Sequence, residues 1–411
     1  MFISEFKIDN FRSLKDVHLK QMQRVCIFHG DNNSGKSNIL AAIEAVLRGK
    51  TIIEDPAAGG GENQPPYRKV PFIQGRLRDF SDNFRFGERD PIKFLICVTF
   101  DDSELAPYKV VIEKIQSKLS RAPNGSADKG KQIRGLKLND GHDKIVRIEG
   151  ELRYVDDSTC EAFTQRIDIN SNFILFQLIS DKPVYIPSLE KSKIPLEERE
   201  NVVTNIVNVL TDSFRLIGTN RSMNPEKLSI NEPLPDFLTP ASFKRSMFRL
   251  ATNRDTYELF KQIKERFNSP PFSFGDISFD VDPKTEQVEI MIEKSSTRLP
   301  LNRIGSGLQQ ILFLIGSIAY NSHRMIGVEE IELNLSPDAQ KRIFETLKSL
   351  VYETKLINQA MVTSHSPYFR NRNDVKYYEV TYDQSTRSTV VKPSTKPSEK
   401  KFFAIPGLPE T

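Results

Sequence analysis

Gly30-Asp31-Asn32-Asn33-Ser34-Gly35-Lys36-Ser37 is a complete G-x-x-x-x-G-K-[ST] phosphate-loop motif. It follows an apolar run at residues 25–28 and precedes residues 38–47, where apolar side chains recur at helical spacing. This is the strand–loop–helix context that the motif requires, because glycines let backbone N–H groups turn toward phosphate oxygens and the helix adds its positive N-terminal end. The stretch predicts a nucleotide-binding loop rather than a chance match in a flexible loop.

The lysine and serine that end this motif have separate expected roles. Lys36 would reach the β- and γ-phosphates of ATP, and the hydroxyl of Ser37 would hold Mg²⁺. The residues that we expect to contact the nucleotide are Gly30, Asn32, Asn33, Ser34, Gly35, Lys36, Ser37 and Asn38. The predicted ligands are therefore ATP and Mg²⁺.

The bulk composition excludes several classes of protein. With 38% hydrophobic and 27% charged residues the 411-residue chain reads as soluble, and its length suits two or three domains. No apolar run approaches the roughly 18 residues of a membrane span, and the N-terminus lacks the pattern of a signal peptide. The three cysteines, Cys26, Cys97 and Cys160, have neither metal-binding nor disulfide spacing. We expect a cytoplasmic protein without a membrane partner, and a net charge of +4 that permits a nucleic-acid partner without arguing for one.

The opening of the chain resembles a known group of ATPases. Residues 8–19 read I-x-N-F-R-S-L-K-x-V-x-L, and residues 30–40 read G-D-N-N-S-G-K-S-N-I-L. Both resemble the RecF/SMC-like and OLD-like ATPases, the ABC-type branch of the P-loop proteins. The resemblance implies an α/β fold, an ABC-type ATPase head with a mixed sheet, flanking helices and an antiparallel side sheet. It also implies a glutamine that contacts the metal, for which Gln74 is the nearest candidate.

A second motif, Gly305-Ser306-Gly307-Leu308-Gln309-Gln310, precedes an apolar helical pattern. A serine hydroxyl and glycine amides at the start of a helix form an anion site, although Gly-Ser-Gly is also an ordinary turn. The motif resembles the ABC signature in its OLD-like variant. That resemblance implies that Ser306, Gly307 and Gln309 face the γ-phosphate of a nucleotide held by a second subunit.

A third motif places Glu329 and Glu330 directly after the apolar residues 325–328. A short strand that ends in two acids is the Walker B arrangement, and the alternative of a charged helix face fits poorly with the preceding apolar strand. The resemblance implies that Glu329 supports Mg²⁺ and that Glu330 polarises the water that attacks the γ-phosphate. Related proteins read E-E-P-E-x-x-L-H-P, whereas here Ile331 replaces the proline and Ser336 replaces the histidine.

The last motif, T-x-H-S-P at residues 363–367, follows another apolar run. It resembles the switch of the same ATPases, which implies that His365 hydrogen-bonds the γ-phosphate. A lone histidine after a strand is otherwise usually structural. The predicted catalytic residues are therefore Lys36, Glu330 and His365.

The motifs suggest how the chain is divided. We expect a first half of the ATPase lobe at 1–100, an inserted and mainly helical arm or dimerisation domain at 101–268, a second half of the lobe at 269–385 and a flexible tail at 386–411. A single basic helix is expected over 242–267. This helix and the basic segment 111–137 are read as solvated surfaces, with contact to a phosphate backbone as the alternative.

Because the signature and the phosphate loop serve different nucleotides, the resemblance implies a head-to-tail homodimer or higher homo-oligomer. The favoured role is that of a nucleotide-switched scaffold in anti-phage defence, resembling the ATPases of PARIS or Septu systems. Such a scaffold senses infection and controls a separate effector, a nuclease or toxin, since the residues after His365 are expected to be too few for a TOPRIM nuclease. The alternatives are a RecF-like DNA-repair ATPase and, less well supported, the nucleotide-binding subunit of a transporter.

Overall fold

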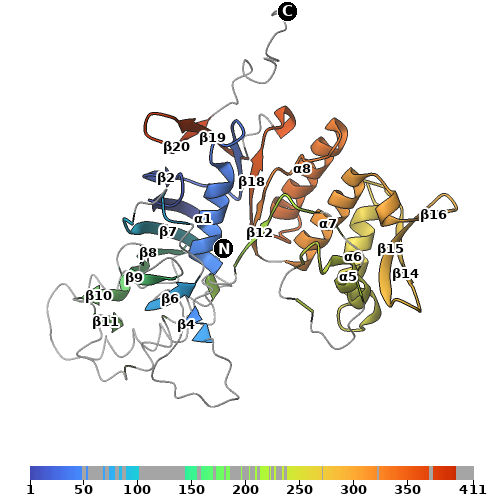
Figure 1. Ribbon diagram of the computed structural model, residues 1–411, viewed down its shortest axis with the longest axis horizontal. Helices are drawn as coiled ribbons and strands as arrows, with labels where there is room; N and C mark the ends of the chain where they lie inside the picture. Colours follow the sequence, from blue (N-terminus) through green and yellow to red (C-terminus); the bar gives the residue numbers. More distant parts are fainter. Residues whose placement is uncertain are drawn as a thin grey trace, which may run out of the picture. The chain divides into compact units, whose positions relative to one another are not determined.

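The computed structural model divides the chain into two compact units, which are described separately (Figure 1). The first unit comprises Met1–Arg24, Asp31–Phe214 and Glu379–Pro393, and the second comprises Val25–Gly30, Arg215–Tyr378 and Ser394–Thr411. The described residues are 1–48, 89–100, 144–154, 159–169, 213–221 and 238–394 with short gaps, and shorter pieces within 52–85, 173–185 and 196–235.

The first unit is built on an antiparallel sheet whose strand order is β11-β10-β9-β8-β7-β1-β2, with β6 paired to β9. Its strands are β1 (Phe2–Asp9), β2 (Val17–Leu19), β6 (Gln74–Arg78), β7 (Ile92–Phe100), β8 (Lys144–Tyr154), β9 (Thr159–Ile169), β10 (Phe173–Ile179) and β11 (Lys182–Tyr185). Strands β4 (Ile52–Ile53) and β5 (Arg68–Lys69) pair with each other and form a separate two-stranded sheet. This sheet is the antiparallel side sheet that the resemblance implied.

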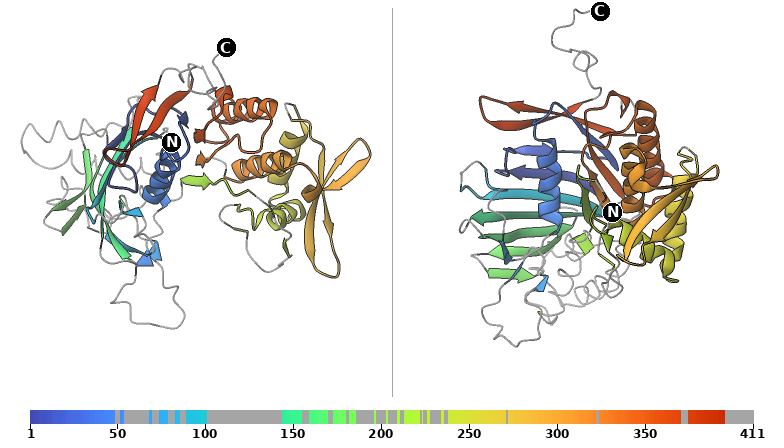
Figure 2. Two further views of the ribbon diagram at one scale, coloured as in Figure 1. Left: turned by 45° about the horizontal axis from the view of Figure 1, so that its top comes forward. Right: turned by 45° about the vertical axis from the view of Figure 1, so that its right-hand side comes forward.

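Alternation of apolar and polar residues gives this sheet one apolar face. On β1, Phe6 and Ile8 are fully buried while Glu5 and Lys7 are half-buried on the opposite face. Helix α1 (Lys36–Arg48) lies across the sheet (Figure 2) and buries its own apolar side. That side comprises Ile39, Leu40, Ala42, Ile43, Val46 and Leu47. The helix that begins at the phosphate loop is thus fixed to the sheet by apolar packing.

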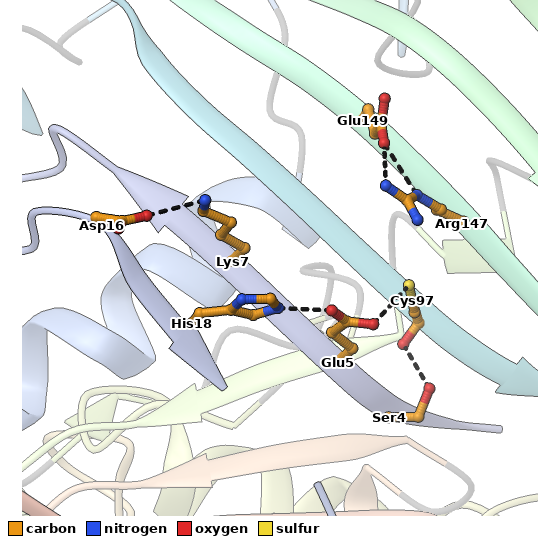
Figure 3. Close-up of polar contacts among 8 residues, drawn as sticks. All are labelled: Ser4, Glu5, Lys7, Asp16, His18, Cys97, Arg147 and Glu149. Atoms are coloured by element: carbon orange, nitrogen blue, oxygen red, sulfur yellow. Dashed lines mark hydrogen bonds and ion pairs between the residues drawn. The ribbon is translucent and has the colours of Figure 1, made fainter. Parts of the chain in front are cut away.

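The other face of the sheet carries a chain of polar contacts (Figure 3). Glu5 links the two neighbouring strands, because its Oε1 lies 2.6 Å from His18 Nε2 and its Oε2 accepts a 3.7 Å hydrogen bond from Cys97 Sγ. Burial raises the pKa of the Cys97 thiol to about 12, and the charge of Glu5 adds to the rise. The thiol therefore stays protonated at neutral pH and is a poor nucleophile.

The second unit contains the sheet whose strands lead into the phosphate loop, the two acids and the switch histidine. Its strands are β12 (Phe214–Ile217), β17 (Met325–Val328), β18 (Gln359–Ser364), β3 (Val25–His29), β19 (Lys376–Asp383) and β20 (Ser388–Ser394), in that spatial order. Of these strands, Phe214 and the residues from Glu379 to Pro393 are assigned to the first unit. The central strands β17, β18 and β3 run parallel and are buried throughout. Such complete burial is typical of parallel strands covered on both faces.

Helices α5 (Phe243–Thr252), α6 (Tyr257–Asn268), α7 (Ser306–Tyr320) and α8 (Pro337–Tyr352) share one apolar core with these parallel strands. A small antiparallel sheet, β13 (Glu226–Lys227), β14 (Asp276–Val281), β15 (Gln287–Lys294) and β16 (Thr297–Pro300), completes the second unit. Helix α7 is buried along residues 310–319. Gly316 permits this close packing, since a Cβ there would lie 2.7 Å from the Phe243 ring. No helix in the described part of the chain has the length and apolarity to cross a bilayer.

The α/β class is confirmed, but the structure of the middle of the chain differs in part from the predicted helical insert. Within 144–185 the described residues form strands β8, β9, β10 and β11, and β8 pairs with β7 across the expected domain boundary at residue 100. The insert was expected to be mainly helical with strand-like segments around 144–148 and 173–178, and those two segments form parts of β8 and β10. Residues 159–169 between them form β9 rather than a helix. The expected tail at 386–411 also begins too early, since β20 forms from the β-branched run at Thr389, Val390 and Val391.

The single helix expected over 242–267 is wrong, because α5 ends at Thr252 and α6 begins at Tyr257. Asn253 causes the break. Its Oδ1 accepts a 2.9 Å hydrogen bond from the backbone N–H of Asp255, a local turn that competes with helical hydrogen bonding. The basic segment 111–137 lies outside the described residues.

Candidate functional site

The phosphate loop has the predicted local structure. It leaves β3 at His29 and enters α1 at Lys36. Gly35 has a φ of +98°, a conformation that favours glycine, and Asn33 has a φ of +61°. Lys36 Nζ donates a 2.7 Å hydrogen bond to the carbonyl oxygen of Asp31, so the lysine lies along the inside of the loop. The loop is therefore an ordered turn at the N-terminus of a helix, the arrangement that an anion site requires.

Strand β20 contacts this loop through the side chain of Thr389. The hydroxyl of Thr389 donates a 3.0 Å hydrogen bond to the carbonyl of Ser34 and lies 2.7 Å from the hydroxyl of Ser13. A Cβ on Gly35 would lie only 2.0 Å from Thr389 Oγ1. Thr389 was not a candidate in the sequence, and only its contacts identify it.

The other loop side chains divide into exposed and internally bonded groups. Asn32, Asn33 and Ser37 are exposed, whereas the Ser34 side chain is buried. Asn38, expected to contact nucleotide, instead uses its amide within the protein: Nδ2 donates to Ser13 Oγ at 2.8 Å, and Oδ1 accepts from Arg12 Nη1 at 3.4 Å. Asn38 therefore positions the start of α1.

The three parallel strands bring the remaining motifs to one edge of a sheet. Val328, Val362 and Ile27 are successive partners across β17, β18 and β3. Because parallel strands end on the same side, the residues that follow them lie along one carboxyl edge. Those residues are Gly30, which begins the phosphate loop, the acids Glu329 and Glu330, and His365. The structure therefore brings the Walker B acids and the predicted switch histidine together with the first residue of the loop.

The acids lie in a tight turn that the backbone holds. The N–H of Glu329 donates to the carbonyl of Ile217 at 2.9 Å, and the N–H of Glu330 donates to Thr363 Oγ1 at 2.8 Å. Glu330 has a φ of +42°, which is rare outside glycine. The backbone N–H of His365 donates to a carboxylate oxygen of Glu332, so the predicted switch is bonded to the acidic turn. Thr363 and Glu332 belonged to quoted motifs, but their roles were not predicted.

A buried arginine lies beneath the same turn and was missed entirely. Arg221 is 2% exposed and donates to the carbonyl oxygens of Gly218, Glu329 and Glu330 and to the side chain of Gln310. Burial lowers the pKa of its guanidinium to about 10, while the charges of Glu332, Glu329 and Glu330 raise it. It therefore remains a cation at neutral pH. No motif surrounds it in the sequence.

The signature residues form the predicted helix start. Helix α7 begins at Ser306, which is exposed, after the N-cap residue Gly305. Gly307 lies against the loop that follows the acids, because a Cβ there would be 2.7 Å from the carbonyl oxygen of Asn334. Gln309 Nε2 donates to the carbonyl of Ile304 at 2.8 Å, which ties this predicted ligand to its own chain.

Among the described residues, no three His, Cys, Asp or Glu side chains cluster as a metal site. Mg²⁺ usually takes one or two protein oxygens and completes its shell with substrate phosphates and water, so it does not depend on such a cluster. The ligand roles of Ser37, in the first unit, and Glu329, in the second, stay predictions. Gln74 is the first residue of β6, paired with Phe163, and its side chain lies outside the described part.

The basic residues of α5 and α6 are partly committed to acids of the same chain. Lys244 is 1% exposed and lies 2.8 Å from Glu289, and Lys264 lies 3.0 Å from Asp276. These two lysines are paired with acids, so they add no support to a nucleic-acid interface there.

Comparison with known proteins gives matches along most of the chain. A sequence family described as an AAA ATPase domain matches residues 1–369. An uncharacterized protein of Methanocaldococcus jannaschii is 25% identical over 285 residues, 66% of this chain and 81% of that protein. An ATP/GTP phosphatase of Helicobacter pylori is 19% identical over 376 residues, 89% of this chain and 86% of that protein. Among solved structures, the SMC head bound to the C-winged helix domain of ScpA aligns over 96% of this chain and 98% of its own, with 14% identity and a TM-score of 0.47.

Gly35→Ala tests the loop geometry. The new Cβ would collide with Thr389 Oγ1, and the alanine would have to adopt a left-handed φ that disfavours side chains. The loop must therefore rearrange. We expect the affinity for Mg-ATP to fall at least about tenfold, measured by isothermal titration calorimetry. Ala45→Gly, which removes one methyl group from the same helix, is the control and should bind nucleotide like the wild type. Wild-type affinity in Gly35→Ala would contradict the assignment of the loop.

Proposed function

The chain belongs to the AAA ATPase domain family, and from that premise we propose that it binds Mg-ATP at the phosphate loop and hydrolyses it. The observation that carries this proposal is the common carboxyl edge of β17, β18 and β3. That edge carries Gly30, Glu329, Glu330 and His365. Phosphoryl transfer needs little covalent chemistry from the protein, and it depends on groups placed to orient water and compensate charge.

Each residue has a defined task in the proposed reaction. Lys36 and the backbone N–H groups of the loop hold the β- and γ-phosphates, and Ser37 and Glu329 would hold Mg²⁺, which neutralises phosphate charge when bound. Glu330 orients the attacking water and accepts its proton. His365 hydrogen-bonds the γ-phosphate.

We propose that two copies are needed for hydrolysis. The exposed Ser306 at the start of α7 would bind the γ-phosphate held by a second copy, since a helix N-terminus with an exposed hydroxyl attracts anions. The γ-phosphate then makes contacts that only the closed assembly provides. Loss of this phosphate on hydrolysis would release the two copies, which makes the assembly a nucleotide switch.

For the biological role, we propose an OLD-like scaffold that senses infection and controls a separate effector in anti-phage defence. The support is the resemblance of the opening, signature and switch residues to that group. A RecF-like role in DNA repair is the alternative, and the acid-paired lysines of α5 and α6 do not favour it.

Glu330→Gln separates binding from hydrolysis. The amide cannot accept the proton of the attacking water, so we expect Mg-ATP affinity to stay within about threefold of wild type while the hydrolysis rate falls at least about 100-fold. The closed assembly should accumulate, which size-exclusion chromatography with light scattering would show as ATP-dependent self-association. Lys36→Ala is the matched control that should neither bind ATP nor associate. Unchanged hydrolysis by Glu330→Gln would remove that residue from its role.

Mixing two inactive variants tests the shared site. Lys36→Ala cannot bind the phosphates through its loop but keeps its signature serine. Ser306→Arg keeps the phosphate-binding loop and lacks the signature serine. In a mixed dimer one of the two sites is complete, so an equimolar mixture should recover ATPase activity, up to about half of the wild-type value if only mixed dimers close. Each variant alone should be inactive. No recovery in a mixture that is shown to form mixed dimers would argue against a site completed by a second copy.

The defence role is tested in cells. The chain should co-purify with the product of an adjacent gene and protect its host from phage, and Lys36→Ala should abolish that protection at equal expression. The plating efficiency of phage gives the readout. DNA-stimulated ATPase activity with steep salt dependence and no protection would instead support the repair role.

A further inference from the structure

Arg221 connects two segments that the motifs treat as separate. On one side its guanidinium donates to the carbonyls of Glu329 and Glu330, the latter at 3.4 Å. On the other side it donates to Oε1 of Gln310, also at 3.4 Å. Gln310 is 7% exposed and lies in the second turn of α7, whose first residue is Ser306. One side chain thus reaches both the acidic turn and the signature helix.

The acidic turn needs such support. Glu330 holds a φ of +42°, and a non-glycine residue stays in that region only when its surroundings fix it. The Thr363 hydroxyl fixes its N–H, and Arg221 and the N–H of Leu333 fix its carbonyl oxygen. Any shift of the guanidinium therefore changes where the Glu330 carboxylate can point.

A second contact joins α7 to the same turn. The Cα of Gly307 approaches the carbonyl oxygen of Asn334 so closely that a Cβ would lie 2.7 Å from it. Asn334 belongs to the loop between the acids and α8. Because packed contacts of this kind transmit small shifts rather than absorb them, a displacement of the start of α7 reaches the turn through both its backbone and Arg221.

The chemistry of the contacts requires a guanidinium. Its donors form a rigid plane that can serve several acceptors at once, and here it serves three carbonyls and one amide oxygen. A lysine ammonium has three donors on one atom and cannot span the same positions. The positive charge also lies among Glu329, Glu330 and Glu332, whose charges stabilise it.

We propose that Arg221 is a positioning residue that couples the signature helix to the hydrolytic acids. It does not touch nucleotide. When the start of α7 engages the γ-phosphate of a second copy, Gln310 moves Arg221, and Arg221 sets the backbone that aims Glu330 at the attacking water. This inference rests on the proposed ATPase function and assigns a residue that regulates it.

Steady-state ATPase kinetics of Arg221→Gln and Arg221→Lys test the coupling, with circular dichroism and thermal unfolding as checks of folding. We expect kcat to fall about 10- to 100-fold, since a small misplacement of a reacting group costs that much. KM, Mg-ATP affinity and ATP-dependent self-association should stay within about threefold. Lys244→Gln is the matched control, because Lys244 is another buried cation of the second unit, paired with Glu289. It should lower the unfolding temperature and leave kcat unchanged.

A double-mutant cycle separates coupling from a merely structural role. Gln310→Leu keeps the side-chain volume and removes the acceptor, whereas Gln310→Glu keeps an acceptor and should retain near wild-type kcat. If Arg221 acts through Gln310, the loss in Arg221→Lys/Gln310→Leu should equal the larger single loss rather than the product of the two. Gln310→Leu alone carries the test if both arginine variants fail to fold.

Three results would overturn the coupling: wild-type kcat in folded Arg221 variants, an equal loss in Lys244→Gln, or losses in the cycle that multiply. Failure of the proposed function is a different result, namely that the wild-type chain itself neither binds nor hydrolyses Mg-ATP.

Discussion

The parallel pairing of β17, β18 and β3 is the constraint on which the site depends. Every residue of these strands is buried, so their backbone groups must pair with one another and a shift in register would leave them unsatisfied. That register makes Val328, Val362 and Ile27 neighbours and so determines which residues emerge together at the carboxyl edge. The functional groups of three distant motifs are therefore positioned first by the apolar interior of the second unit, and contacts such as that between His365 and Glu332 then join the motifs directly.

Polar side chains beneath that edge provide the next level of organisation. Thr363, Glu332 and Arg221 hold the acidic turn through backbone groups, and in doing so they keep Glu330 in a conformation that its own sequence does not favour. In the first unit Thr389 does the same for the phosphate loop by bonding the carbonyl of Ser34 beneath Gly35. In both places a strained turn is maintained by a side chain from another part of the chain, as functional turns commonly are.

The difference between contiguous motifs and side chains that hold them from distant parts of the chain explains what the sequence could predict. The phosphate loop, the acids after β17 and the histidine after β18 were predictable because each is a contiguous pattern whose flanks show strand or helix periodicity. Arg221 and Thr389 were not, since their partners lie 109 and 355 residues away and no local pattern announces them. The single helix over 242–267 was wrong for a related reason. Basic and apolar periodicity continues through Asn253, and only the side-chain turn to Asp255 stops it.

The two departures from the E-E-P-E-x-x-L-H-P pattern have local physical explanations. Ile331, where related proteins have proline, is fully buried and its N–H donates to the carbonyl of Thr363, a bond that proline could not make. Ser336, in place of histidine, is the N-cap of α8, and its hydroxyl accepts from the N–H of Ala339. Serine is favoured at that position because it satisfies an otherwise unpaired helical N–H. Both residues thus contribute a hydrogen bond to the frame that follows Glu329 and Glu330, and the two carboxylates that the chemistry requires are present beside them.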